Sequence, residues 1–162
     1  MTRTLILMRH AKAAGAATDY ERPLSDYGRE VARAQGSAML RALGAGVDLA
    51  LVSAATRARQ TFEALHFGGL EVGEVRFEQE LYLDSGVQAR DLIRTVDDSV
   101  ETLLVLFHQP SVSELAYNLT LPQDEAGLSG GFSAGTFVVG IVDTAWAELT
   151  NWHLSGHYPP TM

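Results

Sequence analysis

The sequence predicts an α/β protein with three layers, α/β/α, built on a central, mostly parallel sheet with an antiparallel edge strand. Short apolar runs alternate along the chain with segments whose apolar residues recur at helical spacing. Strands that alternate with helices pair in parallel and are covered on both faces. The last two apolar runs follow one another without a helix between them, which predicts antiparallel pairing at one edge.

The first half of the chain contains three predicted strands and two predicted helices. The run TLILM at 4–8 indicates a buried strand, and a helix is expected after Ser25. Residues 47–52 (VDLALV) form the second predicted strand, and 74–78 (EVRFE) form a weaker one. Each helix is predicted from apolar residues that recur near helical spacing. They are Val31, Ala34, Ala38 and Leu43 in the first helix, and Ala54, Ala58, Phe62 and Leu65 in the second.

The clearest buried strand of the sequence is TLLVLF at 102–107. A short helix is expected before it, at 89–96. A second helix is expected after it, at 110–119, where Pro110 takes the favoured first helical position.

The C-terminal part of the chain is expected to close the sheet. Residues 120–131 are polar and rich in glycine, which predicts a loop. Residues 134–142 and 146–154 alternate in the manner of strands and are expected to form a hairpin about Asp143–Ala145.

Composition narrows the classes of function. A chain of 162 residues is most simply one domain, 1–162. Its formal net charge of −8 disfavours nucleic acid and anionic membranes as partners. It has no cysteine and no apolar run of the length that spans a bilayer, and its first apolar run is too short for a secretory signal, so we expect a cytoplasmic protein.

Positive and titratable side chains gather where the predicted strands end. Arg9 and His10 follow the first strand, Ser53 and Arg57 follow the second, and His108 follows the strand at 102–107. The carboxyl ends of parallel strands meet at one edge of a sheet, where ligands of such folds bind. The sequence therefore predicts a local anion site on an acidic protein.

Arg57 is an unusual residue for its place in the chain. It lies in the first turn of a predicted helix, where the helix dipole disfavours a cation by about 0.3 to 1 kcal/mol. Either a bound anion or a nearby acidic side chain would offset this cost. Each of the two histidines, taken alone, is better explained by a structural role, and only their joint placement favours a site.

Four segments resemble motifs of the histidine phosphatase superfamily, and in particular of its small SixA phosphohistidine phosphatases. In chain order they are LMRHAK (7–12), DYERPLSDYG (19–28), VSAATRARQT (52–61) and LFHQPSVSELA (106–116). Ala11 stands where many members have glycine, and Phe107 replaces the small residue that usually precedes the second histidine. From the first to the last, the motifs span about two-thirds of the chain.

The resemblance implies a mechanism without metal or other cofactor. His10 would be the nucleophile that accepts the phosphoryl group, with one imidazole nitrogen free and the other held as a donor. Arg9 and Arg57 would bind the phosphoryl oxygens through forked hydrogen bonds, and His108 would add a further donor.

Two supporting roles remain open. Related phosphatases carry a general acid after the third strand, where Glu80 is the candidate and Asp84 the alternative, whereas the SixA group lacks one. Arg22 matches the Arg-Pro-Leu element of the family. It is expected either to line the phosphate pocket or to brace its loop through an ion pair with Asp19 or Asp26. Lys12 is expected to be a solvated surface residue.

The expected substrate is a phosphorylated histidine on another protein, because short connections between the motifs leave little chain for a lid. Two alternatives remain: a broad phosphomonoesterase of the same superfamily that acts on small phosphate compounds, and a phosphate- or phosphoprotein-binding module without turnover. His153 and His157 are not expected to bind metal, since Gly156 and the following prolines disfavour a helix there. His66 is expected at a helix end, where the dipole favours a cation.

Overall fold

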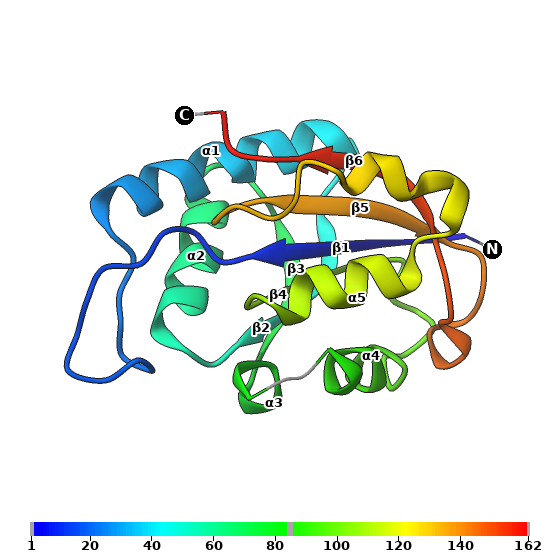
Figure 1. Ribbon diagram of the computed structural model, residues 1–162, viewed down its shortest axis with the longest axis horizontal. Helices are drawn as coiled ribbons and strands as arrows, with labels where there is room; N and C mark the ends of the chain where they lie inside the picture. Colours follow the sequence, from blue (N-terminus) through cyan, green and yellow to red (C-terminus); the bar gives the residue numbers. More distant parts are fainter. Residues whose placement is uncertain (1, 84–85, 162) are drawn as a thin grey trace.

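A computed structural model describes residues 2–83 and 86–161, and in this part of the chain six strands form one sheet (Figure 1). The order across the sheet is β3-β2-β4-β1-β5-β6. The strands are β1 (Arg3–Arg9), β2 (Val47–Ser53), β3 (Val72–Glu78), β4 (Thr102–Phe107), β5 (Phe137–Val142) and β6 (His153–Tyr158). The α-helices are α1 (Asp26–Leu43), α2 (Thr56–Phe67), α3 (Gln79–Tyr82), α4 (Val87–Ile93) and α5 (Ser111–Leu119), and two 3-10 helices are η1 (Pro122–Leu128) and η2 (Trp146–Glu148).

The predicted sheet, mostly parallel with antiparallel pairing at one edge, is confirmed. β1 pairs in parallel with β4, which pairs in parallel with β2, and β2 pairs in parallel with β3. β5 runs antiparallel to both β1 and β6. The carboxyl ends of β1, β2 and β4 therefore lie side by side at one edge of the sheet.

Helices cover both faces of the sheet, as predicted. Leu5 and Leu7 of β1 belong to a buried cluster that includes side chains of α4 and α5. Ile6 and Met8, which alternate with them, belong to a second cluster that includes side chains of α1 and α2. Because successive side chains of a strand point to opposite faces, four apolar residues in a row require apolar layers on both sides.

The start of α1 is fixed by its cap and by a close contact with the first loop. The Ser25 hydroxyl accepts a hydrogen bond from the Gly28 amide (3.0 Å), so Ser25 is the N-cap of the helix that was expected after it. A Cβ at Gly28 would collide with the carbonyl oxygen of Lys12, so only glycine lets α1 lie this close to the loop. In the described part of the chain, no helix is both long and apolar enough to cross a membrane.

The predicted loop at 120–131 and the predicted strand at 146–154 are wrong in part. Residues 122–128 form η1, and 146–148 form η2 rather than a strand. The last strand instead begins at His153, so a longer connection replaces the expected turn at Asp143–Ala145. Antiparallel pairing of the last two strands is nevertheless confirmed.

Two tryptophans explain the misplaced strand. Trp146 and Trp152 are both buried in the cluster beneath α4 and α5, where the indole N–H of Trp146 donates to Val100 O (2.8 Å) and that of Trp152 donates to Thr120 Oγ1 (2.8 Å). The even spacing of apolar residues in 146–154 resembles the alternation of a strand. It arises instead because the rings of Trp146 and Trp152 must both reach this core.

The four predicted helices are confirmed in order and type as α1, α2, α4 and α5, whereas α3 was not predicted. α2 begins at Thr56, so Ala54 precedes it, and α5 begins at Ser111, directly after Pro110. The buried positions of α1 are Gly28, Val31, Ala32, Gln35, Gly36 and Met39. Ala34 of the predicted apolar face is exposed. The buried stripe beside it packs against α2, where a Cβ at Gly36 would collide with Leu65 O.

Candidate functional site

The structure brings His10, Arg9, Arg57 and His108 together at the carboxyl edge of the sheet. Arg9 ends β1, His10 follows it directly, and His108 directly follows β4 on the adjacent strand. The ring centroids of His10 and His108 lie 5.1 Å apart. Arg57, in the first turn of α2, reaches the pair with its Nε 3.3 Å from His10 Nε2.

The His10 ring is held in one orientation. Its Nδ1 lies 2.7 Å from Ala11 O, a backbone carbonyl that can only accept, so Nδ1 carries a proton and donates it. The Ala11 amide donates to Thr61 Oγ1 (3.1 Å), and the Thr61 hydroxyl donates to Arg57 O (2.7 Å). These contacts leave Nε2 with a lone pair that faces the Arg57 guanidinium.

Burial keeps the His10 imidazole neutral. The side chain is nearly enclosed, and the loss of hydration lowers its pKa from 6.5 to about 4. The hydrogen bond to Ala11 O opposes this shift, and the positive charges of Arg57, Arg9 and Arg22 add to it. At neutral pH the residue is therefore an unprotonated nitrogen base beside fixed positive charges.

This lowered pKa predicts a loss of stability in mild acid. The unfolded chain, in which His10 has a pKa near 6.5, binds the proton first as the pH falls, so His10 destabilises the fold progressively between pH 6.5 and 4. From pH 7 to pH 5 its contribution to the free energy of unfolding should fall by about 2 kcal/mol. Urea unfolding at the two pH values measures this, and His10→Ala should remove that part of the loss. An equal loss in the variant would contradict the assignment of the pKa.

His108 is anchored to the neighbouring strand. Its Nε2 lies 2.7 Å from Ser53 Oγ, at the end of β2, and the Ser53 hydroxyl also accepts from the Ala55 amide (3.3 Å). Burial, followed by the charges of His10 and Arg57, lowers the pKa of His108 to about 3. Its buried Nδ1 finds no hydrogen-bond partner among the described residues. A buried group of this kind, beside the catalytic candidates, is where a ligand atom is expected.

Arg9 contributes a partly buried positive charge to the site at the carboxyl edge of the sheet. One end of its guanidinium donates from Nη1 to Phe132 O (2.9 Å), in the loop before β5. Its Nε is buried and lacks a partner within residues 2–83 and 86–161. Burial lowers the pKa of Arg9, which nonetheless stays charged at neutral pH, and its uncompensated charge favours an anion nearby.

The loop between β1 and α1, which Figure 1 shows extending beyond the carboxyl end of β1, supplies an acid that the sequence analysis considered only as a partner for Arg22. Arg57 donates from Nη1 to Asp19 O (2.8 Å) and from Nη2 to Asp19 Oδ2 (3.1 Å). Arg22 donates to Asp19 Oδ1 (3.2 Å) and from Nε to Ala14 O (3.1 Å), so it braces the loop as one alternative expected. Asp19 therefore sits between the two arginines at the solvent edge of the site.

Tyr82, at the end of α3, is a site residue that the sequence analysis missed. Its hydroxyl donates to Asp19 Oδ2 (2.9 Å), and its ring lies edge-on to His108, with centroids 5.7 Å apart. Tyr20 packs against it with centroids 4.9 Å apart and donates to Gln79 Oε1 (3.2 Å). Only the nearness of Tyr82 in the chain to Glu80 pointed to this region, since an aromatic residue there carries no signal of its own.

The remaining candidates lie apart from the four central side chains. Glu80 is exposed on α3, and Asp84 lies outside the described residues. The Lys12 side chain is exposed, as expected. On β6, His153 pairs with Asp143 (3.3 Å) and His157 contacts Gly131 O (2.7 Å). His66 lies in the last turn of α2, and among the described residues no cluster of histidine and acidic side chains could hold a metal ion.

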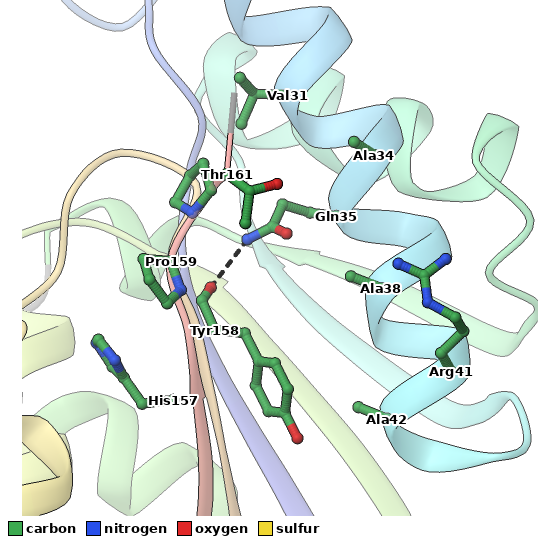
Figure 2. Close-up of a pocket in the computed structure, with 11 residues that line it drawn as sticks. Val31, Ala34, Gln35, Ala38, Arg41, Ala42, His157, Tyr158, Pro159 and Thr161 are labelled. Atoms are coloured by element: carbon green, nitrogen blue, oxygen red, sulfur yellow. Dashed lines mark hydrogen bonds between the residues drawn. The ribbon is translucent and has the colours of Figure 1, made fainter.

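A well-formed cavity of about 560 Å³ lies elsewhere, between α1 and the C-terminal segment (Figure 2). Gln35 stands at its wall and donates from Nε2 to Tyr158 O (2.9 Å) and to Gly135 O (2.7 Å). None of His10, Arg9, Arg57 and His108 lines this cavity. Its lining includes the single cation Arg41 and the imidazole of His157, whereas the sheet edge brings two arginines and two histidines together, so the sheet edge is the candidate site.

The chain is similar in sequence and in structure to known proteins. No family model matches the chain. An uncharacterized protein of Mycobacterium tuberculosis is 42% identical over 112 residues, which are 67% of each chain. Among solved structures, the SixA protein of Nakamurella multipartitia, assigned as a phosphohistidine phosphatase, is 33% identical with a TM-score of 0.86, covering 100% of this chain and 98% of that one. A protein histidine phosphatase SixA complexed with tungstate is 25% identical with a TM-score of 0.75, covering 97% of each chain.

Proposed function

Because the chain belongs to the SixA phosphohistidine phosphatases of the histidine phosphatase superfamily, we propose that it removes phosphate from phosphohistidine on another protein, through a phosphorylated His10 intermediate. Histidine phosphatase activity is the broader part of this proposal, and the phosphohistidine substrate is the narrower part. No metal or other cofactor takes part in the proposed steps.

The observation that carries the proposal is the state of His10. Its Nδ1 proton is committed to Ala11 O, its pKa is lowered to about 4, and its Nε2 is unprotonated and accepts from Arg57 Nε. A nucleophilic histidine requires this combination of one pinned nitrogen and one available lone pair. A module that only binds phosphate needs no such nitrogen, which favours the enzyme over the binding alternative.

The surrounding groups suit a phosphoryl group that is being transferred. Arg57 uses three of its five N–H groups on His10 and Asp19, which leaves two for phosphoryl oxygens. Arg9 Nε and His108 Nδ1 are buried and find no hydrogen-bond partner in the part of the chain that the structure describes. The phosphate dianion would raise the pKa of His108, whose imidazole would then act as a donor. The bound tungstate of the SixA relative, an oxyanion like phosphate, supports this assignment.

The reaction then proceeds in two displacements. His10 Nε2 attacks phosphorus while the bond to the leaving group breaks, and water later attacks the phosphohistidine intermediate and releases phosphate. The positive charge of Arg9, Arg57 and protonated His108 stabilises the charge on the transferring oxygens in both steps.

The leaving group decides between phosphohistidine and ordinary phosphate esters. Glu80, the candidate general acid, is exposed and makes no contact with the central histidines in the described structure. An imidazole leaves readily without such an acid, because the pKa of its conjugate acid is near 6.5, whereas an alkoxide does not. We therefore expect fast turnover of P–N substrates and slow turnover of alkyl phosphates.

This reasoning predicts that Glu80→Gln changes phosphohistidine turnover by less than about tenfold, because loss of a true general acid costs roughly 10² to 10⁴. The measurement is kcat/KM on a phosphohistidine protein and on glycerol phosphate, with Asp84→Asn tested alongside. A hundredfold loss in Glu80→Gln together with good activity on glycerol phosphate would favour the phosphomonoesterase alternative.

Metal dependence tests the proposed chemistry directly. Purified protein treated with EDTA should keep its activity on phosphoramidate within about twofold, since the arginines supply the positive charge. Vanadate, which resembles the five-coordinate transition state, should inhibit. Activity that disappears with EDTA and returns with magnesium or zinc would overturn the proposal.

A further inference from the structure

The solvent edge of the site carries a second cluster, formed by Asp19, Tyr20 and Tyr82. Tyr82 is tied to Asp19 through its hydroxyl and to Tyr20 through an edge-on ring contact. This rim cluster comes from two segments far apart in the chain, the β1–α1 loop and α3. The two displacements described above assign it no task.

Arg57 bridges the rim cluster and the reacting atom, so its contacts show how close the two lie. Its Nε is 3.3 Å from His10 Nε2, and its Nη2 is 3.1 Å from Asp19 Oδ2. The same guanidinium group therefore contacts both the Asp19 carboxylate and the proposed nucleophile, His10 Nε2. A phosphoryl group held by Arg57 would lie next to Asp19.

Burial shows which way a leaving group must point. His10 and Arg57 are only 9% and 7% exposed, whereas the Asp19 side chain is 53% exposed. In-line displacement places the leaving group opposite His10 Nε2, hence on the outer side of the phosphorus. A group leaving in that direction passes the rim cluster before it reaches solvent.

The chemistry of the rim favours a cationic ring. Hydrogen bonds from Tyr82, then Arg22 and Arg57, lower the pKa of Asp19 to about 2, so its carboxylate stays charged. These bonds fill three of its four acceptor positions, two on Oδ2 and one on Oδ1. One acceptor position on Oδ1 remains for a ligand N–H. The Tyr82 ring, beside it, offers an aromatic surface for a flat or cationic group.

We propose that Asp19 and Tyr82 form a leaving-group subsite that selects a protonated, planar imidazole, a proposal that rests on the proposed function. Tyr82 packs against the ring of the substrate phosphohistidine, and Asp19 accepts the N–H of the ring nitrogen that does not carry phosphorus. When the P–N bond breaks, its electron pair stays on the ring nitrogen that carried phosphorus. Because the other ring nitrogen already holds a proton, the ring leaves as neutral imidazole. The subsite thus makes P–N substrates good ones in a site without a general acid.

The test compares two phosphoryl donors that differ in their leaving group. N-phosphoimidazole releases a flat, protonated ring, and acetyl phosphate releases a small anion. We expect Tyr82→Leu and Asp19→Asn each to lower the kcat/KM ratio of phosphoimidazole to acetyl phosphate by about tenfold or more, and Tyr82→Phe, which keeps the ring, to lower it by less than threefold. In the wild type kcat/KM on phosphoimidazole should fall as the pH passes the pKa of the substrate ring, and Asp19→Asn should weaken this dependence.

Matched controls lie at the opposite end of the molecule. Asp143→Asn, after β5, and Tyr117→Leu, near the end of α5, make the same changes of side chain away from the rim and should leave the ratio unchanged. Thermal unfolding checks that all variants are folded.

The outcomes separate the two proposals. If the wild type cleaves phosphoimidazole but the rim variants lose activity equally on both donors, the subsite is overturned while the phosphatase assignment stands. If the wild type cleaves acetyl phosphate and leaves phosphoimidazole intact, the phosphohistidine substrate itself is contradicted before any variant is measured.

Discussion

His10→Ala is expected to lower kcat at least about 10⁴-fold while leaving the fold intact. The variant loses the nitrogen that accepts the phosphoryl group in the proposed first displacement. The other anion-binding groups remain, so phosphate or vanadate should still bind. Rates of phosphoramidate hydrolysis and binding of vanadate measure the two effects separately.

Labelling identifies the atom that carries the phosphoryl group. Rapid quenching of the wild type into alkali, where phosphohistidine survives, should trap one phosphate per chain on Nε2 of His10, because Nδ1 is hydrogen-bonded to Ala11 O. His66→Ala, which removes an exposed histidine at the end of α2, is the matched control and should label normally. Label on a serine or an aspartate, or on Nδ1, would contradict the mechanism.

Arg57→Ala is expected to lower kcat/KM by about 10³-fold, the second largest effect. One oriented donor to a transition-state oxygen is typically worth 10² to 10³ in rate, and Arg57 also contacts the nucleophile through Nε. Arg57→Lys should restore less than a tenth of the lost activity. A lysine ammonium cannot reach His10, the Asp19 backbone and the Asp19 carboxylate from one planar group.

The neighbouring arginine provides the control. Arg59 lies on the same helix, is exposed, and donates to Ala54 O while its guanidinium packs on the Phe77 ring. Arg59→Ala removes an equal charge and should keep kcat/KM within about threefold. An Arg57→Lys variant with near wild-type activity would show that charge alone suffices and that the forked geometry has no role.

Some features of the fold could be predicted from the sequence because they depend on local periodicity. The apolar runs at β1 and β4 require two covered faces, helical spacing locates α1 and α2, and Pro110 marks the start of α5. The C-terminal strand could not be located in this way. Its start at His153 follows from the burial of Trp146 and Trp152 in one core, which overrides the local alternation.

The sequence by itself determined that Arg9, His10, Arg57 and His108 share one edge, because residues that follow parallel strands emerge on the same side of a sheet. It also left two partners open for Arg57, an anion or an acid. The tertiary structure decided that Asp19 is that acid in the free protein, with two N–H groups still available for a phosphoryl group.

Only the tertiary structure decided the rim of the site. The β1–α1 loop has no periodic pattern, and α3 is a single turn, so neither segment carries a local signal for its neighbours. Their meeting at Asp19 and Tyr82 depends on where β3 ends beside β2 and on how the loop crosses the carboxyl edge. The direction of the strands could be predicted from the local alternation of strands and helices. Contacts between two irregular segments, by contrast, depend on the packing of the whole chain.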